Sequence, residues 1–359
     1  MRYYIITGEP SGDIHAANLV NELKKIDLDC SIRAWGGERL TQEGVSIAKN
    51  IKETAFMGLW SVLLNLRTIK SNLNFCKRDI FAFRPDALIL VDYPGFNLKI
   101  AEFAKKNGIK VCYYISPKVW AWNKSRILKI RKFVDHLLVI FPFEVAFYKK
   151  YGVEVTYVGN PLLDEIKRKD FSFSFETSKP IIALLPGSRK QEIEAILPSM
   201  LEVVASYPSY NFVIAATNTF SKSYYQSFIK QNNVSCVYNE TYGLLSNAKA
   251  ALVTSGTASL ETALFKVPQV VCYKTNWLTY IVAKNLMTID YLSLVNILLK
   301  KESVKELIQY ELNKKNLKAE LDLILNKGEK ILTDYRDLSD LLKQQGASKN
   351  AAQYIISTF

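Results

Sequence analysis

An aspartate follows directly on one of the apolar runs of this sequence. Asp92 comes after Ala87–Val91 and opens the segment Asp92-Tyr93-Pro94-Gly95-Phe96-Asn97. If the run is a buried strand of a parallel sheet, the carboxylate stands at the carboxyl end of that strand, where open α/β sheets bind ligands. A carboxylate there can take the proton from an attacking hydroxyl, as a sugar transfer with inversion requires. The alternative is a turn carboxylate that accepts hydrogen bonds from backbone amides before Pro94-Gly95.

A second polar loop, Gly8-Glu9-Pro10-Ser11-Gly12-Asp13, lies between the apolar run Tyr3–Thr7 and a stretch with helical spacing. Its glycines permit a tight turn and the close approach of a ligand. The loop does not have the G-x-G-x-x-G pattern of dinucleotide-binding folds. We therefore predict a site at this strand end formed by Glu9, Ser11, Gly12 and Asp13, with capping of the following helix by Ser11 or Asp13 as the alternative.

Two loops in the second half of the chain are suited to phosphate. Leu185-Pro186-Gly187-Ser188-Arg189 and Ser255-Gly256-Thr257-Ala258-Ser259-Leu260-Glu261 each join an apolar run to a helical pattern and offer backbone amides at a helix N-terminus. Arg189 adds a charged donor, and Glu261 could accept hydrogen bonds from ribose hydroxyls. Each loop alone could be an ordinary capped turn. Together they predict a diphosphate site that consists of Gly187, Ser188, Arg189, Ser255, Gly256, Thr257 and Glu261.

The apolar runs that carry these loops predict two α/β domains. Four runs lie in the first half (Tyr3–Thr7, Ala87–Val91, Val111–Ile115 and Leu137–Ile140) and four in the second (Ile181–Leu185, Phe212–Ala216, Ala251–Thr254 and Gln269–Tyr273), with helical segments between them. We expect two Rossmann-like, doubly wound parallel sheets that face a cleft. Residues 300–359 show helical spacing and no strand pattern, so we expect only helices there.

The domain boundaries follow from where the apolar pattern stops. Residues 166–180 lose it and end in proline, which is typical of an exposed connection. We therefore expect a first domain at residues 1–165 and a second at residues 181–340. A last helix at residues 341–359 is expected to pack back on the first domain.

Composition and charge limit the class of protein. The hydrophobic fraction of 49% and the charged fraction of 23% are those of a packed globular chain. The net charge of +13 predicts an anionic partner, which could be nucleic acid, a phospholipid surface or a phosphorylated substrate. The five cysteines are scattered without a C-x-x-C pair, and His15 and His136 cannot complete a zinc site with them. We predict a reducing cytoplasmic location and no bound metal, with Asp27-Leu28-Asp29 as a solvated turn.

Any membrane contact is expected to be peripheral. No secretory signal pattern opens the sequence, and no uncharged run reaches the ~20 residues that span a bilayer. The segment from Phe56 to Lys70 predicts a helix that is apolar on most sides, and we expect Met57, Trp60 and Leu63 to enter a membrane interface. A helix buried on all sides is the alternative.

Seven motifs follow one another in an order that resembles the lipid-A-disaccharide synthases. They are GEPSGD, DYPGFN, SPKVWAW, FPFE, VGNPLLD, LPGSR and SGTASLE, and with a later segment they extend from Gly8 to Gln309. The resemblance implies a two-lobed GT-B fold and an inverting glycosyltransferase that needs no cofactor. The implied donor is UDP-diacylglucosamine, and the implied acceptor is diacylglucosamine 1-phosphate, whose 6-hydroxyl is glycosylated with release of UDP.

The resemblance also implies roles for single residues. The family's catalytic carboxylate falls on Asp92, its first glycine-rich loop on Glu9, Ser11 and Asp13, and its UDP-binding positions on Arg189, Ser255, Gly256, Thr257, Glu261, Asn296, Glu306 and Gln309. The sequence departs from residues common in the family at Pro10, Gly95, Asn160, Val295, Lys300 and Lys305. The implied location is the inner face of the cytoplasmic membrane, without nucleic acid as a partner and with a homodimer left open.

Two other classes of protein fit part of this pattern. UDP-N-acetylglucosamine 2-epimerases share the two-lobed architecture and also need nucleotide loops in the second lobe, but they need no lipid acceptor. A basic lipid- or nucleic-acid-binding protein would need the charge of +13 but not Asp92.

Overall fold

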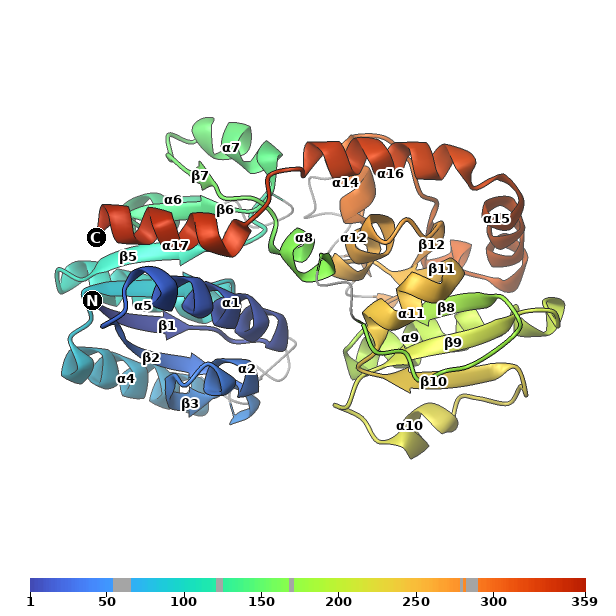
Figure 1. Cartoon of the computed structure of the whole chain (residues 1–359), viewed down its shortest axis with the longest axis horizontal. Helices are drawn as coiled ribbons and strands as arrows, with labels where there is room; N and C mark the ends of the chain where they lie inside the picture. The colour runs from blue at the N-terminus through green and yellow to red at the C-terminus, as the bar shows by residue number, and fades with distance from the viewer. Residues whose placement is uncertain (54–65, 121–124, 168–170, 278–279, 282–289) are drawn as a thin grey trace. The chain divides into compact units, whose positions relative to one another are not determined.

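The structure is a computed structural model that describes residues 1–53, 66–120, 125–167, 171–277, 280–281 and 290–359 (Figure 1). The chain divides into two compact units. One combines Met1–Asp164 with Gln344–Phe359, and the other consists of Glu165–Lys343. Met57, Trp60 and Leu63, which we predicted to contact a membrane, lie outside the described residues.

The first unit contains a seven-stranded sheet in the order β3-β2-β1-β4-β5-β6-β7, and its paired strands are all parallel. The strands are β1 (Arg2–Ile6), β2 (Ser31–Gly36), β3 (Ser46–Asn50), β4 (Ala87–Val91), β5 (Lys110–Tyr114), β6 (His136–Val139) and β7 (Thr156–Tyr157). The helices are α1 (Pro10–Ile26), α2 (Glu38–Gln42), α4 (Leu66–Phe83), α5 (Pro94–Lys106), α6 (Arg126–Phe133), α7 (Pro142–Lys149), α8 (Pro161–Ile166, whose last two residues belong to the second unit) and α17 (Ala347–Thr358). Helices between the strands supply the crossovers that parallel pairing needs.

The second unit contains a six-stranded parallel sheet in the order β10-β9-β8-β11-β12-β13. The strands are β8 (Ile181–Leu185), β9 (Asn211–Ala216), β10 (Val234–Tyr238), β11 (Ala248–Thr254), β12 (Gln269–Tyr273) and β13 (Glu306–Ile308). The helices are α9 (Lys190–Leu201), α10 (Lys222–Gln226), α11 (Thr241–Asn247), α12 (Thr257–Leu264), α14 (Leu294–Leu299), α15 (Lys314–Lys327) and α16 (Glu329–Leu341). The two predicted parallel sheets are therefore confirmed, and all eight predicted apolar runs form strands.

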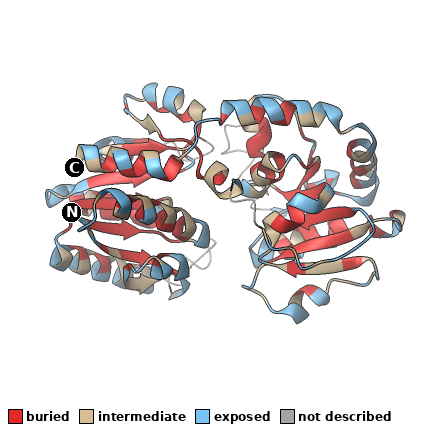
Figure 2. Ribbon diagram, in the orientation of Figure 1, coloured by how far each residue is buried: buried red, intermediate tan, exposed pale blue. Residues whose placement is uncertain are grey.

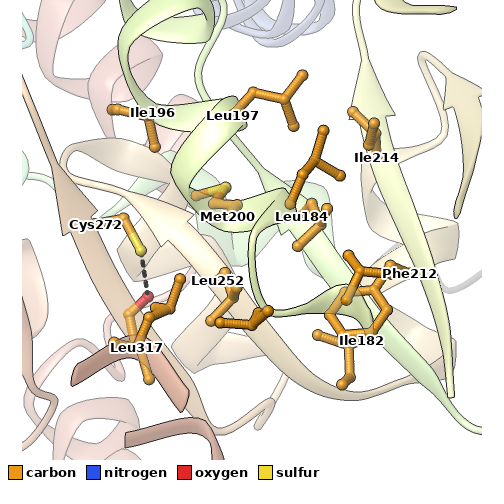
Figure 3. Close-up of a cluster of buried hydrophobic side chains, with 14 of the residues drawn as sticks. Ile182, Leu184, Ile196, Leu197, Met200, Phe212, Ile214, Leu252, Cys272 and Leu317 are labelled. Carbon is orange, nitrogen blue, oxygen red and sulfur yellow. Dashed lines mark hydrogen bonds between the residues drawn. The ribbon is translucent and has the colours of Figure 1, made fainter. Parts of the chain in front are cut away.

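Both faces of each sheet are buried, as continuous apolar strands predict. In β1, Tyr4 and Ile6 belong to one core cluster, whereas Tyr3 and Ile5 belong to another. Figure 2 shows buried strands beneath helices whose outward sides are exposed. In the second unit, side chains of the strands pack against α9 and α15 in a cluster that includes Leu184, Ile196, Met200, Leu252 and Leu317 (Figure 3).

The expectation of helices alone beyond residue 300 is wrong at one place. Glu306–Ile308 forms β13, which pairs with β12 from Val271↔Glu306 to Tyr273↔Ile308. A strand of three residues is too short to show alternation in the sequence. It forms because the edge of β12 offers unpaired backbone donors and acceptors.

The last helix, α17, belongs to the core of the first unit. Ala351, Ala352 and Ile355 are fully buried and share a cluster with Leu19 and Val20 of α1. The start of α17 is held by Asp164, whose Oδ1 accepts a hydrogen bond of 2.8 Å from the Gly346 amide. The small residues Ala351 and Ala352 let α17 pack closely against α1.

We predict that Ile355→Ala destabilises the first unit by about 2–5 kcal/mol, because it deletes a buried aliphatic side chain and leaves a cavity. Gln353→Ala, on the exposed side of the same helix, is the matched control. Urea unfolding of both variants measures the difference. Equal midpoints for the two variants would mean that α17 is not part of the folded core.

Candidate functional site

The loops that follow β1 and β4 lie side by side at one edge of the first sheet. The two strands are parallel neighbours, so both end at this edge. β2 continues the sheet on one side of β1, whereas β4 and β5 continue it on the other, and the strand order reverses between β1 and β4. Such a reversal is where open α/β sheets bind ligands. The structure thus brings together two of the predicted site elements, the loop 8–13 and Asp92.

Close packing joins the two loops. A Cβ atom on Gly8 would lie 2.2 Å from Cγ of Tyr93, so only glycine fits at this position. Burial, and then the negative charge of Glu9, raises the pKa of the Tyr93 hydroxyl. Ser11 is exposed near the start of α1.

Asp92 has a strained backbone. Its φ is +45° and that of Tyr93 is +50°, the left-handed region that non-glycine residues seldom adopt. Two buried groups hold the turn through the Asp92 carbonyl oxygen, which accepts hydrogen bonds from Asn97 Nδ2 at 2.7 Å and from the Tyr113 hydroxyl. Strain of this kind persists only where the surroundings fix it, and it concentrates at functional sites.

The two groups that hold Asp92 are themselves firmly placed. Asn97 is fully buried in the first turns of α5, and its Nδ2 also lies 3.3 Å from the Val91 carbonyl oxygen. Burial, and then the negative charge of Asp92, raises the pKa of Tyr113 well above its usual value, so this hydroxyl remains a donor. Neither residue was predicted as part of the site. Asn97 lies within the quoted DYPGFN motif, but Tyr113 is one tyrosine in an apolar strand and gave no signal.

Asp13 has a role different from that of its loop neighbours. Its side chain is buried, and its two oxygens accept hydrogen bonds from the amides of Gly37 at 2.6 Å and Arg39 at 3.0 Å. These amides lie at the start of α2. The helix capping left open by the sequence therefore exists, but the capped helix is α2 rather than α1. Gly12 is buried against Thr7 and Val91, where it lines the interior of the turn.

The second sheet reverses its strand order between β8 and β11, and the two predicted phosphate loops follow these strands. Gly187 has φ +108°, and a Cβ atom there would lie 2.5 Å from Oε2 of Glu192. Arg189 stands just before α9, is 54% exposed, and its Nη1 donates to Oε1 of Glu192 at 3.2 Å. Ser188 is exposed beside it. The guanidinium therefore lies on the surface of this strand end.

The second loop has an open side. Gly256 has φ +135°, and a Cβ atom there would meet no atom of the described residues within 4 Å, so the backbone conformation requires glycine. Thr257 begins α12 and is exposed. The side chain of Ser255, which precedes Gly256, is fixed by a hydrogen bond, because its Oγ donates to the Leu292 carbonyl oxygen at 2.9 Å. Among the described residues, nothing covers this side of Gly256 just before the start of α12, and an anion site there requires such room.

Glu261 lies one turn into α12 and accepts a hydrogen bond from a tyrosine. The Tyr242 hydroxyl donates to Oε1 of Glu261 at 3.0 Å, and the Tyr242 ring is in contact with the rings of Phe171 and Phe265. Burial raises the pKa of Glu261 above its usual value. The carboxylate is held in one orientation by a neighbour that the sequence did not identify.

The three remaining residues that we predicted to bind the nucleotide form hydrogen bonds to other residues of the second unit. Asn296 donates to the Val304 carbonyl oxygen and to Glu306 Oε1, both at 2.8 Å, and accepts from the Ser303 and Val304 amides. Glu306 accepts from the amides of Leu292 at 2.8 Å and Ser293 at 2.9 Å. Gln309 exchanges two hydrogen bonds with the backbone of Thr275. All three side chains stabilise loops at this edge of the sheet.

Within the described part of the chain, no three His, Cys, Asp or Glu side chains converge as metal ligands would. Burial lowers the pKa of His15 to about 4, so this histidine is neutral near pH 7. None of the helices searched in the described ranges is both long and apolar enough to cross a membrane.

Solved structures share the fold over almost the whole chain. The UDP-GlcNAc 2-epimerase of Neisseria meningitidis, solved with UDP-GlcNAc, has a TM-score of 0.67 at 14% identity, with 100% of this chain and 99% of that chain covered. The glycosyltransferase of kitacinnamycin has a TM-score of 0.69 at 13% identity, with 99% and 98% covered. Both sheets, with their helices, therefore have the GT-B architecture.

Similarity in sequence is more specific. A lipid-A-disaccharide synthase of Syntrophus aciditrophicus is 37% identical, with 97% of this chain and 95% of the relative covered. Lipid-A-disaccharide synthase 1 of Legionella pneumophila is 38% identical, with 87% and 85% covered. The family model of lipid-A-disaccharide synthetase matches residues 3–358. Since these matches extend through both strand-order reversals and the loops described above, the chain belongs to the lipid-A-disaccharide synthetase family.

Proposed function

We propose that Asp92 is the general base of lipid A disaccharide synthesis in this protein. The reaction transfers diacylglucosamine from UDP to the 6-hydroxyl of diacylglucosamine 1-phosphate. The observation that carries the assignment is the strained, doubly hydrogen-bonded turn that places a carboxylate at the strand-order reversal of the first sheet. Asp92 takes the hydroxyl proton as the oxygen attacks the anomeric carbon. The bond to UDP breaks on the opposite face, which inverts the configuration and leaves a β-1,6 linkage.

The second unit is proposed to hold UDP. The side of Gly256 that no described residue covers leaves room for a phosphate near the amides that begin α12, and the dipoles of α9 and α12 favour negative charge there. Arg189 supplies a positive charge from the surface of the neighbouring loop. Glu261, held by Tyr242, is placed to accept hydrogen bonds from the ribose hydroxyls. Gly187, Ser188, Ser255 and Thr257 complete the two loops.

Asn296, Glu306 and Gln309 are proposed to act on the nucleotide site indirectly. Glu306 fixes the backbone of Leu292 and Ser293, and the Leu292 carbonyl oxygen accepts the hydrogen bond from Ser255. Asn296 donates to the same carboxylate. These contacts connect β13 with the loop before α12, so we expect Asn296 and Glu306 to position that loop. Gln309 is expected to position the segment after β12, because it bonds to the Thr275 backbone.

The protein is further proposed to work as a peripheral protein at the inner face of the cytoplasmic membrane, because both of its substrates carry acyl chains. The segment with Met57, Trp60 and Leu63 is the proposed membrane contact, on the strength of its apolar sequence and its flanking basic residues.

The proposed reaction is tested by incubating the purified protein with the UDP-linked donor and the monosaccharide 1-phosphate and by mass spectrometry of the products. We expect a disaccharide 1-phosphate and UDP. Asp92→Asn should lower kcat by ~10²–10⁴-fold, the usual effect of losing a general base. Asp29→Asn, at an exposed carboxylate, should leave kcat unchanged. Isomerised UDP-sugar without disaccharide would instead indicate an epimerase. A fully active Asp92→Asn variant would show that Asp92 is not the general base.

Arg189→Ala and Glu261→Ala should each weaken UDP binding by ~1.5–3 kcal/mol, because each removes a charged hydrogen-bonding group. Lys190→Ala is the matched control for Arg189, since this neighbour is exposed and reaches Glu194 at 3.8 Å. Calorimetric titration with UDP measures all three. Unchanged affinity in both site variants would mean that the nucleotide lies elsewhere.

Trp60→Ser combined with Leu63→Ser should reduce sedimentation with anionic liposomes about tenfold or more, because burying one apolar side chain contributes roughly 1.5–3 kcal/mol. Leu323→Ser, at a half-exposed leucine of α15, is the control. UDP affinity should not change in either protein. Normal sedimentation of a folded double variant would place membrane contact on another surface.

A further inference from the structure

The segment that leaves β5 begins with an unfavourable backbone conformation. Ile115 has φ +63°, a true outlier for a β-branched residue. Its amide donates to the Leu138 carbonyl oxygen of β6 at 3.1 Å, next to the last paired residues of β5 and β6. Ser116 and Val119 are buried just beyond it. Contacts with another element must hold this segment in place, because a strained residue relaxes unless its surroundings prevent it.

Helix α7 supplies the first of these contacts. The hydroxyl of Tyr148, which is fully buried, is hydrogen-bonded to the Ser116 hydroxyl and lies 3.5 Å from the Pro117 carbonyl oxygen. The tyrosine thus meets the segment one residue after the strained Ile115.

The second contact is made by a buried carboxylate. Glu144, in the first turn of α7, is 1% exposed, and its Oε1 accepts a hydrogen bond of 3.2 Å from the indole N–H of Trp120. Its Oε2 accepts from the amides of Ile140 at 3.2 Å and Phe141 at 3.0 Å. Burial raises the pKa of Glu144 to about 7. An ionisable group is costly in such surroundings, and an apolar residue would pack there at lower cost. Through these hydrogen bonds, Glu144 connects the residues that follow β6 with the segment after β5.

The strand whose exit is held in this way is the strand that holds Asp92. Tyr113 of β5 donates its hydroxyl to the Asp92 carbonyl oxygen, and the Asp92 amide donates to the Tyr114 carbonyl oxygen at 3.4 Å. Ile115 follows Tyr114 directly. A shift in the exit of β5 therefore moves both of the groups that contact the Asp92 backbone.

We propose that Glu144, Trp120 and Tyr148 are positioning residues for the general base: they hold the exit of β5, and β5 in turn holds the Asp92 turn. None of the three needs to touch substrate. The inference rests on the proposed role of Asp92 and extends it to a second layer of side chains in the SPKVWAW and FPFE motifs.

Two conservative substitutions test it. Trp120→Phe and Tyr148→Phe each remove one hydrogen-bonding group and keep an aromatic ring, so the fold should survive. We expect kcat to fall about 10- to 100-fold, the range for a small misplacement of a reacting group. UDP affinity should stay within about twofold of the parent, a change of less than ~0.4 kcal/mol. Tyr157→Phe is the matched control, because the buried Tyr157 hydroxyl has no hydrogen-bond partner among the described residues.

A double-mutant cycle separates positioning from a general loss of folded protein. In an Asp92→Asn background, Trp120→Phe should change the residual rate by less than about twofold, since the base it positions is already gone. A folding defect would instead lower the residual rate by the same factor as in the parent. Parental kcat in both Trp120→Phe and Tyr148→Phe, with the kcat of Asp92→Asn reduced as expected, would overturn this inference alone. An active Asp92→Asn would overturn the proposed base itself.

Discussion

The reversal of strand order inside each parallel sheet is the constraint on which the site depends. Parallel neighbours end at one edge, and where the order reverses, the loops that follow them diverge to opposite faces. β1 and β4 provide this place in the first unit, and β8 and β11 provide it in the second. Every loop that we assign to chemistry follows one of these four strands. The strand order of each sheet therefore determines where these loops lie, and their polar residues determine the chemistry.

Buried carboxylates then give the loops at these edges a fixed shape. Asp13, Glu144 and Glu306 each accept two backbone amide hydrogen bonds, from the starts of α2 and α7 and from the segment before α14. Amides near a helix start have no partner within the helix and would lose free energy if buried unpaired. A carboxylate from another element satisfies two of them at once. Loop geometry at the site is thereby coupled to the packing of the cores.

The sequence was informative where a pattern was long or a motif was local. All eight apolar runs form strands, because residues buried on both faces of a sheet leave a continuous signal. Asp92 and the three glycine-containing loops could be proposed as site elements from the sequence, because each follows such a run directly. Tyr113, Tyr242 and Glu144 were missed as site residues because their partners are distant in sequence, and β13 was missed because three residues show no period. The internal hydrogen bonds of Asn296 and Glu306 likewise depend on tertiary contacts that spacing does not encode.

The placement of α17 has a consequence for how the protein is made. The first unit includes helix Ala347–Thr358, so its core lacks Ala351, Ala352 and Ile355 until these residues have been synthesised. The whole of Glu165–Lys343, by contrast, is available to fold earlier. Domains generally fold as units during synthesis, with the N-terminal one first. Here residues 165–343 are translated between the two parts of the first unit, so we expect the surface of α1 that α17 covers to stay exposed on the nascent chain while the second unit is made.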